Sequence, residues 1–593
     1  MHFVPYRSRS ELHKMPFGAV KAGEAFTLRV ILPRGMGCRG VKLRWGDYDG
    51  AWERAKAFWW EGMQGEDEEW WQCRLTVDEP GLYRYRFAYD SDSGGGLIGD
   101  EGQGVGRIDG GDWWRLTVYN PALRLPEWVR GAVLYQIFPD RFCNSGGSKS
   151  DVPAGRVLRE DWGGAPLWNP DAHGRITQYD FFGGDLRGIA QKLDYLQGLG
   201  VTCLYLNPIF RARSNHRYDT ADYYQIDPLL GGYEDFVYLC GEAHRRGMRV
   251  LLDGVFSHTG ADSLYFNKYH SYTGPGAYES QDSPYYGWYT FRQWPEDYAC
   301  WWGMDILPEL REERPEVLEF FTGEGGVVPH WLRAGADGWR LDVADELPDV
   351  FLDRVFECAA RLKPDAYLLG EVWEDASCKW SHGGRRRFLL GGQMHSVMNY
   401  PLAAAILRFA QEAQAEQLAE TVLSQLEHYP PCAIDGLMNH IGTHDTPRIL
   451  TRLSQGTRPG EPPPEGEVAR RRRLCAALQY TLPGNPCVYY GDEAGLEGAM
   501  DPFNRACYPW GEEDRELLDW YRRLGELKHG HKCFAGGALR LLSAALGCVA
   551  FTREAEGDAV TVIANANPHG IAYTLPDGRD VEVEGISARI LCG

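Results

Sequence analysis

The pattern of hydrophobic and polar positions changes twice along the chain and divides it into three stretches. In residues 1–122, short alternating runs such as Phe26–Leu32 and Leu82–Ala88 are separated by glycine and proline turns. A period of two is typical of strands that bury one face, so this stretch predicts an N-terminal β-sandwich. Residues 533–593 alternate in the same way, for example at Val560–Asn565, and predict a smaller C-terminal β-sandwich.

The middle stretch, residues 123–532, has a different pattern. Apolar runs alternate there with segments whose apolar residues recur every three or four positions, as expected for amphipathic helices. Strands that alternate with helices in this way predict a (β/α)8 TIM barrel, so the chain is expected to be a multidomain α/β and β protein. The predicted barrel strands lie in Ala132–Pro139, Val201–Pro208, Met248–Val255, Gly338–Val343, Tyr367–Glu371, Gln393–Met398, Leu437–Thr443 and Pro486–Tyr490.

An irregular segment interrupts the barrel pattern directly after the third strand. Residues 258–312 are rich in Tyr, Gly, Ser and Trp and show no clear helical period. Long irregular loops are uncommon in compact domains unless they have a function. We therefore predict an inserted domain over 258–312, with the barrel built from 123–257 and 313–532.

Polar side chains follow several of the predicted barrel strands. In TIM barrels the carboxyl ends of the strands carry the catalytic residues. Three carboxylates from three different strands should therefore converge at one mouth of the barrel. The candidates at these strand ends are Asp253, His258, Arg340, Asp342, Glu371, Trp373, His444 and Asp445.

The types of these residues indicate their chemistry. Arg340 and Asp342 are two positions apart on one strand face, so the arginine should keep the carboxylate ionised and able to act as a nucleophile. Taken alone, this pair also fits a structural ion pair. Glu371 lies among apolar residues, which favours a protonated carboxyl and the role of an acid. A nucleophilic and an acidic carboxyl together suit the cleavage of glycosidic bonds, with Asp445 as a third, charge-stabilising group.

Composition narrows the partners and the compartment. The formal net charge of −21 disfavours nucleic acid and anionic membranes as partners. Aromatic residues make up 13% of the chain, which suits stacking on sugars as well as ordinary core packing. The 15 cysteines contain no CxxC pair or zinc-like spacing, and the polar first ten residues give no sign of a leader peptide. We therefore expect a cytoplasmic protein with reduced thiols and without membrane spans.

Several motifs together resemble glycoside hydrolase family 13, the α-amylase family. Within it the chain resembles the neopullulanase, cyclomaltodextrinase and maltogenic amylase branch and the related amylopullulanases. The flanking β domains are also similar to those of that branch. The motifs are Asp253–His258, Gly338–Glu346, Gly370–Trp373, Thr443–Arg448, Asn215–Thr220, Tyr490–Gly495 and Asp501–Arg505.

The resemblance implies a role for each matched residue. Asp342 corresponds to the nucleophile, Glu371 to the acid/base and Asp445 to the stabiliser of the transition state. The implied reaction is retaining hydrolysis of α-1,4-glucosidic bonds in maltooligosaccharides, cyclodextrins, pullulan or starch. Contacts with the substrate are implied for Tyr218, Asp253, His258, Arg340, Trp373 and His444.

The residues after the nucleophile bear on specificity. Asp345 and Glu346 resemble the sequence of the neopullulanase branch, which implies tolerance of α-1,6 bonds and some transglycosylation, with Glu346 in contact with the substrate. The alternative for these two acids is an ordinary helix N-terminus. A transglycosylase that uses the same residues is a rival function. A carbohydrate-binding protein without activity is another, which the intact acids disfavour.

The resemblance also implies a metal site and an assembly. A structural calcium would be held by Asn144, Asp151, the Gly183 carbonyl and Asp185, and no other cofactor is expected. Gly146 and Ser150 stand where ligands are usual, so an empty polar loop is the alternative. Relatives with this N-terminal domain imply a possible homodimer formed through it.

Overall fold

The computed structural model describes residues 3–149, 152–170, 178–455 and 463–593. It forms two compact units. The first contains Met1–Arg124, Asp375–His395 and Ala419–Ile434, and the second contains Leu125–Glu374, Ser396–Leu418 and Asp435–Gly593. Two later segments thus join the N-terminal residues in one unit, which the hydrophobic pattern does not indicate.

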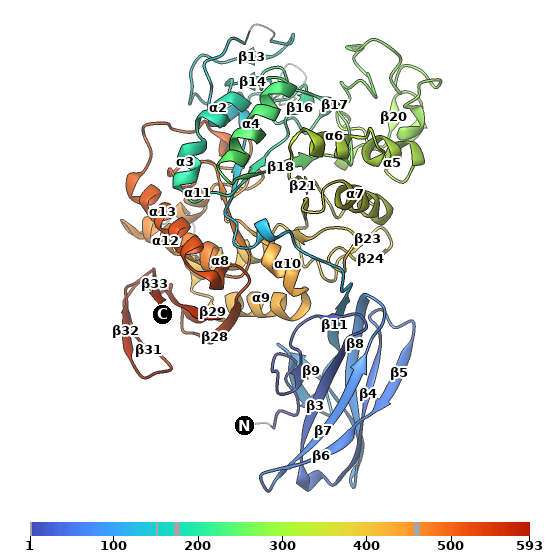
Figure 1. Cartoon of the computed structure of the whole chain (residues 1–593), viewed down its shortest axis with the longest axis vertical. Helices are drawn as coiled ribbons and strands as arrows, with labels where there is room; N and C mark the ends of the chain where they lie inside the picture. Colours follow the sequence, from blue (N-terminus) through green and yellow to red (C-terminus); the bar gives the residue numbers. More distant parts are fainter. Residues whose placement is uncertain (1–2, 150–151, 171–177, 456–462) are drawn as a thin grey trace. The chain divides into compact units, whose positions relative to one another are not determined.

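The first unit is built on two packed, mainly antiparallel β-sheets (Figure 1). Alternate residues of their strands point inward, and the core between them is rich in aromatic side chains, among them Tyr85, Phe87 and Trp114. This is the predicted N-terminal β-sandwich. Its longer strands are β3 (Ala25–Pro33), β4 (Cys38–Asp47), β5 (Glu53–Ala57), β6 (Trp59–Gln64), β7 (Glu68–Thr76), β8 (Gly81–Ser91), β9 (Gly94–Gly102), β10 (Val105–Ile108) and β11 (Trp114–Tyr119).

The second unit contains the predicted barrel. Eight strands pair in parallel in chain order, and an isolated bridge between Met398 and Met438 closes the ring. The strand residues are almost all buried, as expected for a parallel sheet covered on both sides. The strands are β12 (Leu134–Ile137), β15 (Cys203–Leu206), β18 (Arg249–Gly254), β21 (Gly338–Leu341), β22 (Tyr367–Gly370), β25 (Ser396–Val397), β26 (Met438–Asn439) and β27 (Asn485–Tyr489).

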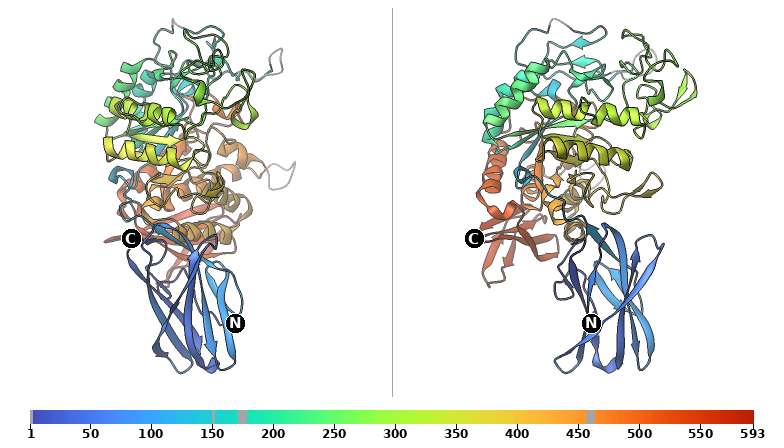
Figure 2. Two further views of the ribbon diagram at one scale, coloured as in Figure 1. Left: turned by 90° about the vertical axis from the view of Figure 1, so that its right-hand side faces the viewer. Right: turned by 45° about the vertical axis from the view of Figure 1, so that its right-hand side comes forward.

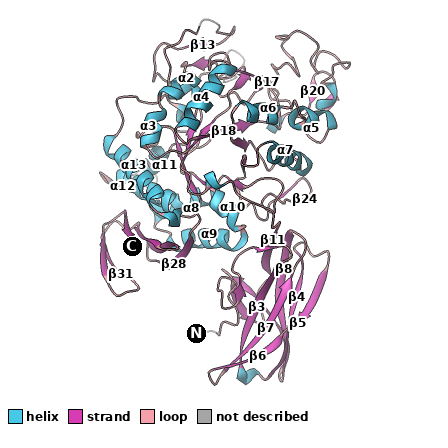
Figure 3. Ribbon diagram, in the orientation of Figure 1, coloured by secondary structure: helices cyan, strands magenta, loops and turns pink. Residues whose placement is uncertain are grey.

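Helices surround the barrel strands (Figure 3). The α7 helix shows why: its buried residues Phe351, Leu352, Val355, Cys358 and Ala359 form one stripe at helical spacing. No helix in the described ranges is long and apolar enough to cross a membrane. The main helices of this unit are α2 (Leu186–Gln191), α3 (Leu193–Gly198), α4 (Tyr233–Arg245), α5 (Pro315–Thr322), α6 (Val327–Ala334), α7 (Asp349–Leu362), α8 (Tyr400–Glu412), α11 (Ile449–Ser454), α12 (Glu467–Thr481) and α13 (Arg515–Gly530).

Two smaller parts complete the second unit. The insertion after β18 holds a short hairpin, β19 (Phe291–Gln293) and β20 (Asp297–Tyr298), followed by the single turn η4 (Trp301–Gly303). The C-terminal residues form two further sheets, seen in red in Figure 2. Their strands are β28 (Ala538–Ala545), β29 (Cys548–Ala555), β30 (Asp558–Asn565), β31 (Ile571–Thr574), β32 (Asp580–Val583) and β33 (Ser587–Cys592).

Candidate active site

The register of the barrel strands brings the predicted residues to one rim. Asp253 of β18 pairs with Arg340 of β21, and Leu341 pairs with Gly370 of β22. Asp342 is the residue directly after β21, and Glu371 is the residue directly after β22. Because the strands are parallel and in register, their polar ends meet at the carboxyl side of the barrel.

The Arg340 guanidinium lies at the centre of the site and is fully buried. Its Nη1 donates to Asp253 Oδ1 at 2.7 Å and to Asp342 Oδ1 at 2.6 Å. Its Nη2 lies 2.7 Å from Glu371 Oε2, an ion pair whose angle falls outside that of a hydrogen bond. Nε contacts the Met398 sulfur at 3.4 Å. One cation therefore orients three carboxyl groups from three adjacent strands.

The charge balance of this cluster includes effects on Asp342 that the sequence does not show. Arg340 alone should hold Asp342 ionised, but burial and the carboxyls of Glu371, Asp253 and Asp445 raise its pKa well above the ordinary value despite the arginine. Burial likewise raises the pKa of Asp253. Asp253, Asp342 and Asp445 therefore hold protons more readily than isolated carboxyls do. The sequence shows the neighbouring arginine of Asp342 but not the acids that other strands bring to it.

Asp445 and His444 form the opposite side of the site. Burial and the nearby Glu371 raise the pKa of Asp445 to about 7, although Arg505 and Arg340 oppose this. Gln136 Nε2 donates to His444 Nδ1 at 2.8 Å, so Nε2 carries the ring proton. That nitrogen lies 3.1 Å from Asp445 Oδ2. Burial and the same two arginines hold the pKa of His444 well below its usual value, so the ring is neutral.

Tyr218 connects the two sides. Its hydroxyl donates to Asp253 Oδ2 at 2.8 Å and accepts from His444 Nε2 at 2.5 Å, and its ring is stacked on that of His444. His258 Nε2 donates to the Tyr218 carbonyl at 3.1 Å, and Ser257 Oγ donates to His258 Nδ1 at 2.9 Å. Burial lowers the pKa of His258 to about 4, so it too is neutral. The structure thus brings all of these predicted residues together.

Glu371 has a second set of partners on its other oxygen. Oε1 accepts from Trp373 Nε1 at 3.1 Å and from the Tyr400 hydroxyl at 3.2 Å. Oε2 accepts the backbone N–H of Val343 at 2.9 Å. Val343 has a φ of 40°, the left-handed region that β-branched residues avoid. A strained residue directly after Asp342 therefore directs its amide at the carboxyl of Glu371.

Glu346 binds two neighbouring tryptophans. Its Oε2 accepts from Trp301 Nε1 at 2.7 Å and its Oε1 accepts from Trp302 Nε1 at 2.9 Å. The Trp301 ring lies 5.5 Å from that of His258, whereas Trp302 is 78% exposed. Glu346 therefore positions an exposed aromatic surface near the rim, and Trp373 adds another ring that is 47% exposed.

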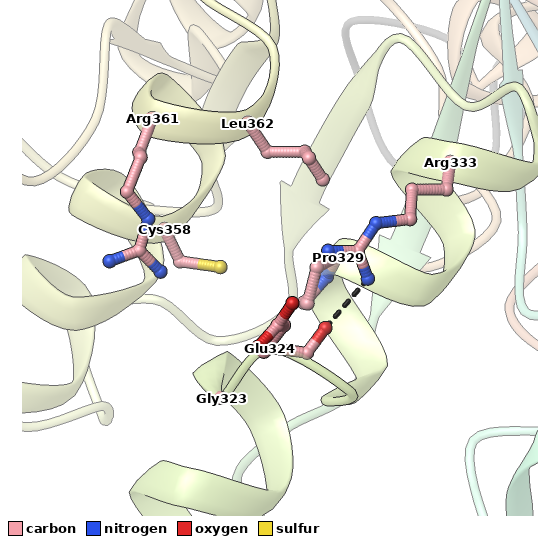
Figure 4. A pocket seen from close by; sticks show the side chains of 7 residues that line it. All are labelled: Gly323, Glu324, Pro329, Arg333, Cys358, Arg361 and Leu362. Atoms are coloured by element: carbon pink, nitrogen blue, oxygen red, sulfur yellow. Dashed lines mark hydrogen bonds between the residues drawn. The ribbon is translucent and has the colours of Figure 1, made fainter.

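A separate pocket lies between the helices outside the barrel (Figure 4). It has a volume of about 420 Å³, and the Arg333 guanidinium donates to the Glu324 carbonyl at 2.6 Å beside it. It is lined by Gly323, Glu324, Pro329, Arg333, Cys358, Arg361 and Leu362. None of the residues predicted for catalysis or substrate binding lines this pocket, so it is distinct from the candidate active site.

The predicted calcium ligands lie close together but have other partners. Asp185 caps α2 by accepting from Gly188 N, and its Oδ2 also accepts from Ser145 Oγ at 2.7 Å and from the Lys149 ammonium. Lys149 Nζ also donates to the Leu229 carbonyl at 3.0 Å. Asn144 Oδ1 accepts the N–H of Gly146, and Gly183 adjoins Asn144.

An ammonium group already occupies the position beside Asp185, and Gly146 offers no side-chain oxygen. Described carboxylates and imidazoles form no group of three that could hold a metal. Asp185 and Asn144 thus bond to protein groups in this structure, and a calcium ion, which needs six or more oxygen ligands, stays a prediction. Asp151 lies outside the described residues, so its part in a calcium site stays a prediction.

Sequence reasoning missed several residues of the site. Tyr205 donates to Asp253 Oδ2 at 2.8 Å from the middle of β15, and Gln136 reaches His444 from β12. Arg505 donates to the His444 carbonyl at 3.1 Å and lies in a motif that was recognised without being given a role. Tyr400 follows β25 by three positions, where polar residues of a barrel strand are expected. That offset from the strand end is the signal that would have found it.

Comparison with known proteins agrees with this geometry. The family model described as the catalytic domain of alpha amylase matches residues 136–523. The chain belongs to the alpha-amylase family. This confirms the resemblance inferred from the motifs and accounts for the barrel with polar residues at its strand ends.

Relatives in the alpha-amylase family have related names. The chain is 36% identical over 464 residues to a cyclomaltodextrinase of Geobacillus thermopakistaniensis, covering 76% of this chain and 71% of the relative. It is 35% identical over 600 residues to an amylopullulanase of Thermoanaerobacterium saccharolyticum, covering 89% of this chain and 45% of the relative. The chain thus spans less than half the length of that amylopullulanase. The structure of the type III pullulan hydrolase from Thermococcus kodakarensis matches with a TM-score of 0.70 at 28% identity over 100% of both chains.

Proposed function

We propose that the chain is a retaining glycoside hydrolase that cleaves α-1,4-glucosidic bonds, and some α-1,6 bonds, in maltooligosaccharides, cyclodextrins, pullulan or starch. The observation that carries the proposal is the bridge that Arg340 makes between Asp342 and Glu371. Retaining enzymes hold two such carboxyls ~5–5.5 Å apart, whereas inverting enzymes leave room for water between them. The names of the relatives supply the substrate class.

In the first step an Asp342 carboxylate oxygen forms a bond to the anomeric carbon. Glu371 gives its proton to the glycosidic oxygen, the bond from that oxygen to the anomeric carbon breaks, and the second sugar leaves as an alcohol. The proton that the carboxyl cluster retains is placed on Glu371 in this proposal. Asp445 faces the positive charge that develops on the sugar, and neutral His444 and Tyr218 offer polar contacts without adding charge.

In the second step the Glu371 carboxylate takes a proton from water. The water oxygen attacks the anomeric carbon, the ester bond breaks, and Asp342 leaves as a carboxylate, so the configuration is retained. A sugar hydroxyl in place of water would give transfer instead of hydrolysis. The exposed rings of Trp302 and Trp373 could seat either an acceptor or a leaving sugar. The related enzymes named above favour hydrolysis as the main reaction.

Product analysis tests the proposal. Separate incubations with maltotriose, γ-cyclodextrin, pullulan and soluble starch should release shorter sugars, and chromatography of the pullulan products identifies the bond cleaved. We expect Glu371→Gln to lower turnover ~10²–10⁴-fold, since general acid catalysis contributes that much. Glu526→Gln, at an exposed position of α13, is the control. A Glu371→Gln variant as fast as the wild type would exclude the assignment, and products longer than maltotriose in excess would favour transfer.

A further inference from the structure

We propose that Tyr400 is a positioning residue for the acid/base Glu371 and for the neighbouring ring of Trp373. The inference rests on the hydrolase function proposed above and extends it to a residue that the motifs do not include. Tyr400 is the first residue of α8. It is 7% exposed, so it belongs to the wall of the site rather than to its surface.

The hydroxyl of Tyr400 reaches the carboxyl oxygen that the arginine does not contact. Arg340 and the Val343 amide lie against Glu371 Oε2, whereas Tyr400 and Trp373 donate to Oε1. Oε1 of Glu371 therefore has two donors and Oε2 has one donor and an ion pair, so the carboxyl plane is held from both sides. Neutral donors on Oε1 support the carboxylate that Glu371 becomes once its proton has moved to the glycosidic oxygen.

The ring of Tyr400 has a second contact. It is stacked on Trp373 with centroids 4.0 Å apart and an interplanar angle of 16°. Trp373 is half-exposed, so its free face is available to a sugar while its other face rests on Tyr400. Behind Tyr400, the His440 ring packs edge-on with centroids 4.4 Å apart. One tyrosine therefore links the acid/base to the flat surface beside the leaving group.

The backbone of Tyr400 is also well anchored. Asn399 caps α8 by accepting from Leu402 N, and its Nδ2 donates to Asn439 Oδ1 at 2.9 Å. The stack on Trp373 and the buried His440 leave the tyrosine ring little freedom to rotate. A hydroxyl held in this way loses little entropy when it bonds to Glu371, which suits a positioning residue.

The charged groups that face Glu371 determine how the hydrogen bond from Tyr400 affects the pH profile of kcat/KM. They are Arg340 from β21, Asp342 beyond that strand and Asp445 beyond β26. His440, on the far side of Tyr400, is neutral over the working range because burial lowers its pKa to about 3. Removing the Tyr400 hydroxyl withdraws support from the ionised form of Glu371. The alkaline limb of kcat/KM, where the acid loses its proton, should therefore move to higher pH.

The test compares two substrates that differ in their need for an acid. Maltotriose has a poor leaving group that must be protonated, whereas the fluoride of α-maltosyl fluoride leaves without being protonated. We expect Tyr400→Phe to lower kcat/KM for maltotriose about tenfold, as for one lost hydrogen bond to a charged group, and to leave α-maltosyl fluoride within about twofold. Tyr521→Phe is the matched control, because Tyr521 is buried and its hydroxyl has no hydrogen-bond partner among the described residues.

The outcomes separate this inference from the proposed function. If the wild type cleaves neither substrate, the hydrolase function fails and the inference fails with it. If the wild type is active and Tyr400→Phe slows both substrates equally, or neither, Tyr400 does not act through Glu371. An unmoved alkaline limb would overturn the inference in the same way. Tyr400→Leu, which also removes the ring, should in addition raise KM for maltotriose because Trp373 loses its support.

Discussion

Asp337 and Arg340 lie three residues apart on one strand segment and show opposite uses of charge. At Asp337, one buried carboxylate faces two cations, Lys363 Nζ at 2.7 Å and Arg249 Nη1 at 3.2 Å, and the imidazole of His244, whose Nε2 lies at 2.7 Å. At Arg340, one buried cation faces three carboxyls. The first arrangement fixes one charge state and suits stability. The second leaves acids in competition for protons and suits catalysis.

The Asp337 cluster predicts a pH-dependent contribution to stability. Burial alone would raise the pKa of Asp337, but hydrogen bonds from His244 and Lys363 and the charge of Lys363 lower it. A depressed folded-state pKa stabilises the fold above the unfolded value of ~3.9, and the contribution is lost as pH falls through the folded value. Asp337→Asn should therefore lower Tm by several degrees at pH 7, in keeping with ~3 kcal/mol for broken buried pairs.

Melting curves at pH 7 and near pH 3 check this prediction. The gap in Tm between the wild type and Asp337→Asn should narrow at the lower pH, because the carboxyl of the unfolded chain is then protonated and part of the stabilisation is lost. Asp282→Asn, at an exposed position of the insertion, controls for the loss of one charge. An equal gap at both pH values would show that the carboxylate charge does not matter.

At the scale of elements, the ammonium group of a lysine supplies a positive charge in the loop between α1 (Pro139–Phe142) and α2. Lys149 joins Asp185, the cap of α2, to the carbonyl of Leu229. Its side chain is 12% exposed and that of Asp185 is 4% exposed, so water screens the pair weakly. The lysine thereby ties the loop to α2 and to the carbonyl of Leu229.

This arrangement predicts how the protein responds to chelation. We expect EDTA and added calcium to leave Tm unchanged, because the ammonium of Lys149 already supplies the positive charge beside Asp185. Lys149→Met should lower Tm by several degrees, since it leaves a buried carboxylate without its cation. Lys56→Met, at an exposed position of β5, is the control. A fall in Tm with EDTA that calcium reverses would contradict the prediction.

The strands could be predicted from the sequence, but several contacts between distant elements could not. The eight strands and their polar ends were predictable, because apolar runs and the geometry of a barrel determine which side chains share a rim. The raised pKa of Asp342 was not predictable, since it depends on carboxyls from other strands. Gln136 and Tyr400 were missed because each acts through a partner far away in the chain. The grouping of Asp375–His395 with the N-terminal residues likewise depends on tertiary contacts.

At the scale of the whole molecule, exposed aromatic side chains bear on assembly. Trp59 and Trp60 are 47% and 54% exposed and lie on β6, which ends the sheet β1-β3-β7-β6. An edge strand with exposed indoles is a surface that favours contact with another chain. A second copy of this chain is the partner that the family resemblance implies.

Sedimentation should therefore give a mass near twice the 67.0 kDa of the chain. We expect the double variant Trp59→Ser/Trp60→Ser to sediment as a monomer with an unchanged Tm, since neither indole belongs to the core. Leu546→Ser, at a side chain that is 91% exposed in the turn between β28 and β29, is the control and should remain dimeric. A wild-type mass near 67.0 kDa would count against the dimer.

The closure of the barrel has a consequence for the lifetime of the active enzyme. Among the described residues, β25 and β26 are joined by the one bridge between Met398 and Met438, whereas each of the other neighbouring strands shares two or more pairs. This seam contacts Arg340 through Met398 and leads directly into Tyr400. If β25 and β26 separated locally, Glu371, Tyr400 and Trp373 would lose their arrangement, while the other seven pairs of neighbouring barrel strands stayed hydrogen-bonded. We therefore expect activity to be lost under milder conditions than those that unfold the barrel.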